Sequence, residues 1–220
     1  MIITVIGATG NLGRQLLTKG LERGHSVRAI SRSIESTGAD LNPAIERFPG
    51  SDSTPEVMAQ AFTGVDVVLS VFPPSLANPA DYSNQLTRVL EAAKSAGVPR
   101  VIGLVGSAGT MTSKGIHLVD TDYFGETARN FYQGVHAAWD SYRNERDYPW
   151  VAFVPAARMQ NHMPELGHYR TRTDEQLVTT DDDSWHFFEV SQISYPDLAA
   201  AMLDEAERPM HNHAFVTVGY

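Results

Sequence analysis

Three glycines near the start of the chain form the pattern with the clearest chemistry. Gly7, Gly10 and Gly13 follow the apolar run 2–6 and open a helical segment. A strand, a tight turn and a helix start of this kind aim backbone N–H groups and the positive end of a helix at one point, which suits a dinucleotide pyrophosphate. We expect Gly7 to turn the strand, Gly10 to admit the phosphate and Gly13 to let the helix pack closely. The alternative is an ordinary strand-to-helix loop.

A second signal follows the next apolar run, 26–30. Ser31, Arg32 and Ser33 stand where an Asp or Glu would hold the ribose hydroxyls of NAD. A guanidinium between two hydroxyls suits a 2′-phosphate, because Arg can donate two parallel charged hydrogen bonds to it. The sequence therefore favours NADP(H) over NAD(H), the alternative being an exposed arginine at a strand end.

The elements that would position these residues alternate along the chain. We expect strands at 2–6, 26–30, 44–48, 65–72, 100–105, 150–154 and 214–218, and helices at 11–24, 55–62, 81–96, 124–146 and 196–207. Thr54 is expected to cap the second helix, before Pro55. This alternation predicts an α/β fold, a Rossmann-like doubly wound parallel sheet in a single NAD(P)-binding domain over residues 1–220.

Residues 158–193 depart from this alternation. They contain polar turns, the strand candidate 177–180 and the acidic run 181–183, which reads as a solvated turn. Because ligands of open α/β sheets bind beyond the carboxyl ends of the strands, we expect this small irregular region to cover the substrate. The alternative is a surface excursion without that role.

Segments along the whole chain carry a family resemblance. The segments are GATGNLG, VIGLVGSAG, IHLVDT, the PAA of FVPAAR, ISYPDLAAAMLDEAERP and FVTVGY. With these segments the chain resembles the atypical short-chain dehydrogenases of the NADH-flavin reductase group, relatives of biliverdin-IXβ/flavin reductase and of NmrA-like proteins. The resemblance implies NAD(P)H bound along the strand ends and, for some relatives, reduction of a flavin, so FMN or FAD is a candidate substrate.

The resemblance also extends the candidate cofactor site beyond the glycines and Arg32. In this fold Asp52 falls where it could contact the adenine, and the alternative is a simple turn aspartate. The further cofactor-binding candidates are Thr9, Asn11, Leu12, Phe72, Ser107 and Pro155.

Ser107 and Tyr123 are the catalytic candidates. Short-chain dehydrogenases combine Ser with Tyr-x-x-x-Lys, in which the lysine helps the tyrosine to exchange a proton with a carbonyl. Four residues after Tyr123 stands Thr127, so carbonyl chemistry by this triad is disfavoured. Direct hydride transfer to a flavin depends mainly on positioning. Ser107 matches the serine after the fifth strand of the flavin reductases and could contact the nicotinamide or the acceptor, or be a turn serine.

The acceptor itself leaves a weaker signal. No histidine matches the one that biliverdin reductases carry after the sixth strand, which disfavours biliverdin chemistry. Between residues 158 and 173 stand three arginines and one glutamate, against a total net charge of -9. Arg158 and Arg170 are therefore candidates for the phosphate of FMN, with salt pairing to nearby acids as the alternative.

Composition limits the remaining functions. A net charge of -9 and a pI near 5.3 argue against direct binding of nucleic acid or an anionic membrane. The sequence holds no cysteine, and His211 and His213 lack an evident third ligand, so we expect no metal site. We expect a cytoplasmic protein with a small-molecule acceptor, and a homodimer is compatible with the sequence.

Two functions remain open at this stage. The first is an NAD(P)H-dependent oxidoreductase that reduces a flavin or quinone-like acceptor. The second is an NmrA-like redox sensor that binds the nucleotide without turnover. The physiological acceptor, the strictness of NADP use and the oligomeric state are not determined by the sequence.

Overall fold

The computed structural model describes residues 1–37, 40–52, 54–111, 115–122, 125–160, 162–173 and 191–220. Its first half contains β1 (Ile2–Ile6), α1 (Asn11–Glu22), β2 (Ser26–Ser31), α2 (Ile34–Thr37), β3 (Glu46–Pro49), α3 (Pro55–Phe62), β4 (Val67–Ser70), η1 (Pro79–Asp81), α4 (Tyr82–Ser95) and β5 (Val101–Leu104). Its second half contains η2 (Ser107–Gly109), η3 (Leu118–Asp120), α5 (Glu126–Asn144), β6 (Trp150–Pro155), β7 (Arg158–Gln160), β8 (Arg170–Thr173), β9 (Gln192–Ser194), α7 (Tyr195–Glu207) and β10 (Ala214–Gly219).

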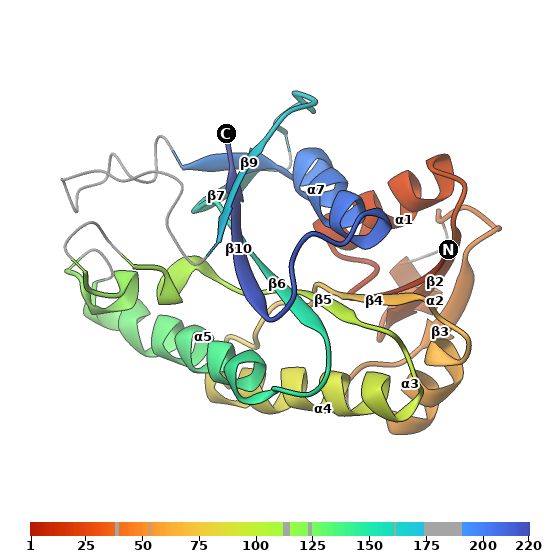
Figure 1. Cartoon of the computed structure of the whole chain (residues 1–220), viewed down its shortest axis with the longest axis horizontal. Helices are drawn as coiled ribbons and strands as arrows, with labels where there is room; N and C mark the ends of the chain where they lie inside the picture. The colour runs from red at the N-terminus through yellow and green to blue at the C-terminus, as the bar shows by residue number, and fades with distance from the viewer. Residues whose placement is uncertain (38–39, 53, 112–114, 123–124, 161, 174–190) are drawn as a thin grey trace.

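Eight strands form one sheet, in the order β3-β2-β1-β4-β5-β6-β10-β8 (Figure 1). All neighbours in it pair in parallel except β8, which runs antiparallel to β10. β7 and β9 form a separate parallel pair. The order 3-2-1-4-5-6 is that of doubly wound dinucleotide-binding sheets, so the predicted Rossmann-like fold is confirmed.

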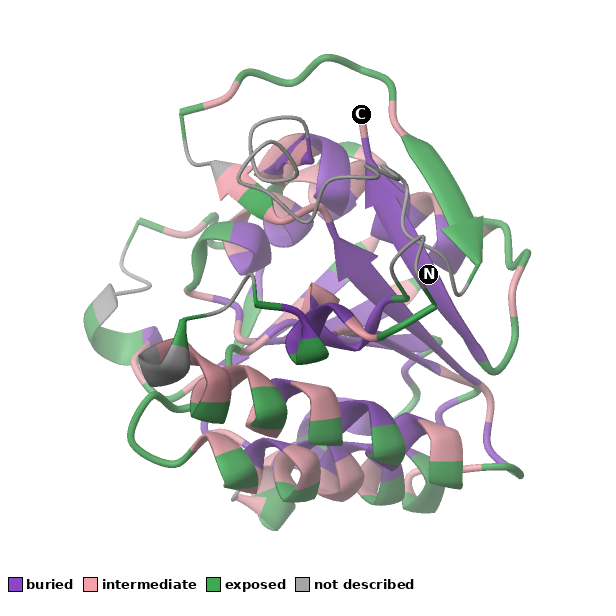
Figure 2. Ribbon diagram, turned by 90° about the vertical axis from the view of Figure 1, so that its left-hand side faces the viewer, coloured by how far each residue is buried: buried purple, intermediate pink, exposed green. Residues whose placement is uncertain are grey.

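Helices cover both faces of this sheet. α1 and α7 pack on one face, and α3, α4 and α5 on the other (Figure 1). Strands enclosed in this way have no solvent face, which is why β4, β6 and β10 are buried at every position (Figure 2). β1 and β4 are adjacent although α1, β2, α2, β3 and α3 separate them in sequence, so the chain reverses its winding between their carboxyl ends.

Several predicted boundaries need correction. The strand expected at 65–72 covers 67–70, the one expected at 44–48 covers 46–49, and the helix expected at 124–146 covers 126–144. Strand ends depend on which neighbouring strand offers hydrogen-bond partners, which local sequence does not encode. The predicted side-chain cap at Thr54 is wrong: its hydroxyl donates to the Ser51 carbonyl and accepts from the Ser51 N–H, each at 2.7 Å.

The segment 158–193 is more regular than expected where the structure describes it. Residues 170–173 are the exposed edge strand β8 of the main sheet, and 158–160 and 192–194 form the β7–β9 pair (Figure 2). The strand candidate 177–180 and the acidic run 181–183 lie outside the described residues. Among the helices that are described, none has the length and apolar character needed to cross a bilayer.

Candidate functional site

The glycine turn lies between β1 and α1, at the reversal of the winding. Gly7 has φ +85°, and a Cβ there would lie 2.8 Å from the backbone nitrogen of Phe72. A Cβ at Gly13 would lie 2.2 Å from the Gly7 carbonyl oxygen. Both positions therefore exclude any larger residue, because no side chain fits between backbone segments that approach this closely.

Gly10 is different, and this difference marks the ligand side of the turn. It has φ -73° and ψ 170°, which any residue adopts, and a Cβ there would meet only the Gly7 carbonyl oxygen, at 3.3 Å. Gly10 is the N-cap of α1, with no side-chain cap and no acidic residue in the first turn. The N–H groups of residues 11–13 therefore have no acceptor within the helix and are free of a side-chain cap, which is the arrangement that binds an anion at a helix start. The turn fits a dinucleotide pyrophosphate.

Three hydroxyl groups gather beside this turn. The Thr9 hydroxyl lies 2.6 Å from that of Ser31 and 3.2 Å from that of Ser33, and the two serine hydroxyls are 3.3 Å apart. Arg32, between the serines, is exposed and forms no hydrogen bond or ion pair with the described residues. The sequence predicted the Ser-Arg-Ser group, whereas the contribution of Thr9 depends on the pairing of β1 with β2.

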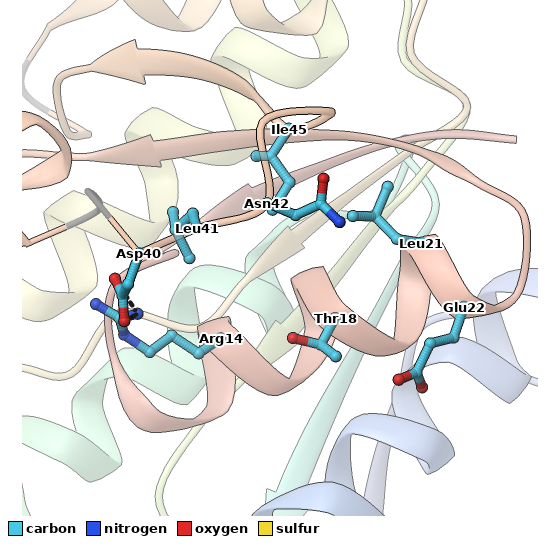
Figure 3. Close-up of a pocket in the computed structure, with 8 residues that line it drawn as sticks. All are labelled: Arg14, Thr18, Leu21, Glu22, Asp40, Leu41, Asn42 and Ile45. Carbon is cyan, nitrogen blue, oxygen red and sulfur yellow. Dashed lines mark hydrogen bonds and ion pairs between the residues drawn. The ribbon is translucent and has the colours of Figure 1, made fainter.

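A cavity of about 390 Å³ lies next to this region, between α1 and residues 40–45 (Figure 3). Arg14 closes one end: its Nε donates to the Thr9 carbonyl at 3.2 Å and its Nη1 contacts both carboxylate oxygens of Asp40 at 2.9 Å. The hydrogen bond from Arg14 lowers the pKa of the Asp40 carboxyl below its ordinary value. The cavity continues along α1 to Leu21 and Glu22, away from the strand ends, so we assign it no cofactor.

Asp52 and Phe72 take up positions around the same edge. The Asp52 carboxylate is 6% exposed and accepts from Arg88 on α4, at 2.6 Å from Nη2 and 3.2 Å from Nε. Sequence analysis missed this partner, since residues 52 and 88 meet only in the fold. The predicted adenine contact of Asp52 stays a prediction. Phe72 follows β4, with its ring edge-on to Tyr82 at 5.7 Å.

Ser107 begins η2, just beyond the carboxyl end of β5. Its carbonyl accepts from the Thr110 N–H at 3.0 Å and from the Thr110 hydroxyl at 2.7 Å, which makes this loop a closed turn. The Ser107 side chain is half-buried, and its hydroxyl makes no hydrogen bond to any described residue. Trp139 on α5 fixes the loop further, because its Nε1 donates to the Gly106 carbonyl at 3.0 Å. Ser107 therefore has a defined position and a hydroxyl available to a ligand.

Next to η2, where Tyr132 packs against the cluster of Ala108, an apolar wall that sequence analysis missed joins three segments. Leu118 of η3, Ala128 and Tyr132 of α5, and Ala157 just after β6 pack together. The helical spacing of 128 and 132 was a usable signal, but only the fold shows that this face meets η3 and the end of β6 rather than the central core.

The other predicted site residues do not come together at one place in the described structure. Pro155 is buried at the end of β6, opposite Val218. Tyr123 lies outside the described residues, so its catalytic role stays a prediction. The exposed Arg158 is on β7, and the Arg170 guanidinium, on the edge strand β8, donates to the Tyr220 carbonyl. β6 and β10 separate β8 from β5, a span of about 14 Å at the usual strand spacing.

The two C-terminal histidines are engaged with protein groups. His211 Nδ1 lies 2.8 Å from the buried carboxylate of Glu205, and His213 Nε2 lies 3.1 Å from the Tyr148 carbonyl. Within the described part of the chain, no group of three or more His, Cys, Asp or Glu side chains could hold a metal ion.

Fold and site together define a class of protein. A doubly wound sheet with a glycine turn at its winding reversal is the structure of an NAD(P)-binding Rossmann protein. A family model described as NAD(P)H-binding matches residues 7–209, so the chain belongs to this NAD(P)H-binding family.

The similarity to known proteins extends over the whole chain. YwnB of Bacillus subtilis (strain 168), a protein without an assigned activity, is 28% identical over 225 residues, covering 99% of this chain and 98% of its own. A solved structure from Streptococcus pneumoniae TIGR4, by name a candidate NADH-flavin reductase, has a TM-score of 0.82 at 22% identity and covers 100% of this chain and 99% of that one. A short-chain dehydrogenase/reductase from Veillonella parvula, solved with NADP, has a TM-score of 0.77 at 17% identity, over 100% of this chain and 94% of that one. Because both sequence identities are below 25%, the likeness to these two solved structures shows the fold alone.

Proposed function

We propose that this protein is an NADPH-dependent oxidoreductase that reduces a flavin by direct hydride transfer. The observation that carries the proposal is the glycine turn, in which Gly7 and Gly13 are closed to any side chain while Gly10 opens the uncapped start of α1. The likeness to a candidate NADH-flavin reductase along the whole chain supports the choice of reaction.

Different parts of the site would bind the pyrophosphate, orient the nicotinamide and exclude water. The N–H groups of residues 11–13 hold the pyrophosphate, because the first turn of α1 offers them no other acceptor. When bound, NAD(P)H supplies the hydride. The Ser107 hydroxyl, beyond β5, orients the nicotinamide amide or the acceptor ring, and the wall of Leu118, Tyr132 and Ala157 excludes water beside it.

Preference for NADPH is supported by the end of β2. Thr9, Ser31 and Ser33 offer three hydroxyl groups within 3.3 Å of one another, and the exposed Arg32 stands between the two serines in the sequence. These groups can donate to a phosphate. The strict NAD site needs a carboxylate at this strand end, and positions 31–33 hold none.

The choice of a flavin is supported by the absence of a lysine four residues after Tyr123 in the sequence. Thr127 occupies the position where the carbonyl-reducing triad has its lysine. A carbonyl acceptor needs a proton delivered as the hydride arrives, whereas a flavin delocalises the charge over its rings, so that positioning by this chain would suffice.

One pair of measurements tests the proposal against a non-catalytic sensor. NADPH oxidation is followed with FMN, FAD and small quinones, and calorimetry with NADPH and NADP is run beside it. We expect turnover that depends on the flavin, together with NADPH binding. Tight NADPH binding without turnover on any acceptor would overturn the proposed enzymatic activity and favour a redox sensor. Absence of NADPH and NADP binding would overturn both proposed functions. The cytoplasmic location and the homodimer stay predictions.

A further inference from the structure

A cavity of about 310 Å³ lies away from the glycine turn, between the last turns of α5, the starts of β6 and β10, and the loop that follows η2. Two arginines and two histidines line it: Arg143, Arg146, His117 and His213. None of its described lining residues is a carboxylate, although the chain as a whole has a net charge of -9. Because the charged groups that line it are all cationic, the cavity favours anions.

Arg143 is held in place by the aromatic side chains beneath it. Trp139, Trp150 and Phe215 are 3%, 3% and 5% exposed and pack on one another, so they offer no open ring face to a ligand. The guanidinium carbon of Arg143 lies 5.3 Å from the Trp139 ring centroid and 5.5 Å from that of Phe215. This cation–π contact positions a guanidinium with five N–H donors, of which the described residues engage one, at 3.3 Å from Asp140.

Arg146 supplies a second guanidinium to the same cavity. It is exposed and forms no hydrogen bond or ion pair with the described residues. The acid that pairs with Arg143, Asp140, does not line the cavity, and its side chain is 61% exposed. An exposed pair of this kind is weak, so it competes little with an anion that reaches both arginines.

The two histidines are each held through one ring nitrogen. His117 Nδ1 donates to the Gly109 carbonyl at 2.9 Å, and His213 Nε2 donates to the Tyr148 carbonyl at 3.1 Å. Since a carbonyl only accepts, these nitrogens carry the proton of each neutral ring, and the opposite nitrogen carries a lone pair. That opposite nitrogen makes no hydrogen bond to a described residue. Protonation of either ring therefore adds a charged donor.

Other titratable groups surround His117. The His136 ring centroid lies 4.7 Å from that of His117. Burial, His117 and Arg143 lower the pKa of His136, while Asp140 and Asp120 act in the opposite direction. The lowered pKa favours the neutral form of His136, so the positive charge of this region is expected on the groups that line the cavity.

We propose that this cavity binds a phosphate group, as the free anion or as a small phosphomonoester. Arg143 and Arg146 would donate charged hydrogen bonds to its oxygens, and His117 and His213 would each add one when protonated. The site borders the loop of Ser107, because His117 holds the Gly109 carbonyl. It does not depend on the proposed reaction, since a protein that binds NADPH without turnover would have the same cavity.

The test uses the whole chain with ¹⁵N-labelled histidine, titrated with inorganic phosphate and with glycerol 3-phosphate. The ring-nitrogen signals of His117 and His213, assigned with His117→Gln and His213→Gln, locate binding. We expect saturable shifts that persist when saturating NADP fills the glycine turn. Tighter binding of inorganic phosphate would identify the free anion as the ligand, and tighter binding of glycerol 3-phosphate a phosphomonoester. No saturation, equal shifts with chloride at the same ionic strength, or loss of the shifts with NADP would overturn the proposal.

Three variants separate this cavity from general surface charge. Arg146→Gln should weaken phosphate about fivefold, since an exposed charge contact is lost. Asp140→Asn should strengthen it about twofold, because Arg143 loses its competing acid. Arg208→Gln, at an exposed arginine after α7, should leave the affinity unchanged. Equal losses in the two arginine variants would overturn the proposal.

The part of the histidines is tested with sulfate, which stays a dianion across the range in which imidazoles titrate. Its affinity should be higher at about pH 6 than at about pH 8, because the protonated rings bind the anion. His213→Gln should reduce this dependence on pH. A sulfate affinity that does not rise in acid would overturn the assignment of the histidines to the site.

Discussion

The two outer glycines of the turn and the one between them have opposite steric environments. Gly7 and Gly13 are enclosed by backbone, whereas the Cβ position of Gly10 is open except toward the Gly7 carbonyl at 3.3 Å. The sequence assigned the same three roles from spacing alone, and the structure adds that, of the three, only Gly10 can be enlarged with no more than a small shift of the Gly7 carbonyl.

Gly10→Val should therefore abolish dinucleotide binding and keep the fold. Valine adopts the extended backbone of this position, and its branches occupy the space where the backbone would approach the pyrophosphate. Circular dichroism and calorimetry with NADPH check both parts. Gly13→Ala is the steric control and should lose stability, because its Cβ would lie 2.2 Å from the Gly7 oxygen. Unchanged NADPH affinity in the valine variant would place the phosphate elsewhere.

Arg32→Glu should weaken NADPH much more than NADH. The substitution replaces a donor to the 2′-phosphate by a repelling carboxylate, and a charged hydrogen bond of this kind contributes about 1.5–3 kcal/mol, or roughly 10- to 150-fold in affinity. Paired titrations with both cofactors measure it, with Arg208→Glu as the charge control. Equal losses for both cofactors would remove the argument for selectivity.

Replacing Arg158 and Arg170 by alanine tests the acceptor phosphate. If these arginines hold it, KM should rise more for FMN than for riboflavin, which has no phosphate, while NADPH affinity stays nearly constant. Arg170 also donates to the Tyr220 carbonyl, so each single variant is needed to separate that contact. Parallel changes for both flavins, or none, would show that these arginines do not recognise the phosphate.

At the scale of elements, one buried carboxylate joins three segments of the C-terminal part. Asp197, 1% exposed in the first turn of α7, accepts from the N–H groups of Leu166 and Gly167 at 2.9 and 3.0 Å. It also accepts from the hydroxyls of Ser194 at 2.7 Å and Tyr220 at 2.6 Å. Burial alone would raise the pKa of Asp197, but these four hydrogen bonds outweigh it, so its pKa lies below the ordinary value.

Asp197→Asn should destabilise the protein at neutral pH by about 2–3 kcal/mol, because the amide offers only one acceptor atom. A carboxyl whose pKa is lower in the folded state stabilises above its unfolded value, about 3.9, and loses that contribution as pH falls through the folded value. The difference between wild type and variant in free energy of unfolding should therefore shrink in acid. Urea unfolding at about pH 7 and about pH 3 measures this, with the exposed Asp147→Asn as control. A difference independent of pH would contradict the assignment.

At the scale of the molecule, α5 approaches the sheet closely at Gly103 of β5. A Cβ at Gly103 would lie 1.8 Å from the Tyr142 hydroxyl oxygen and 2.7 Å from the ring carbon that bears it. Tyr142 is 1% exposed and packs against both Trp150 and Phe215. This contact sets the separation between the helix layer and the sheet.

Gly103→Ala should destabilise the whole domain by about 1–3 kcal/mol, because the added methyl group overpacks this layer. In a Tyr142→Leu background the same change should cost less, since the clashing ring is gone. Thermal unfolding of the four proteins in this double-mutant cycle measures the coupling. Additive losses would show that the two residues do not set the layer separation together.

The sequence by itself determined the α/β class, the glycine turn and the order of the main elements, because strand and helix periodicity and glycine spacing are local properties. It did not determine the partner of Asp52, the joining of Thr9 to Ser31, the edge strand β8 or the stacking of Phe215 on Trp139. Each of these brings together residues distant in sequence: Arg88 meets Asp52, and Phe215 meets Trp139, only after the sheet has chosen its strand order. Strand order follows from burial of both sheet faces across the whole chain, which is a property of the tertiary structure alone.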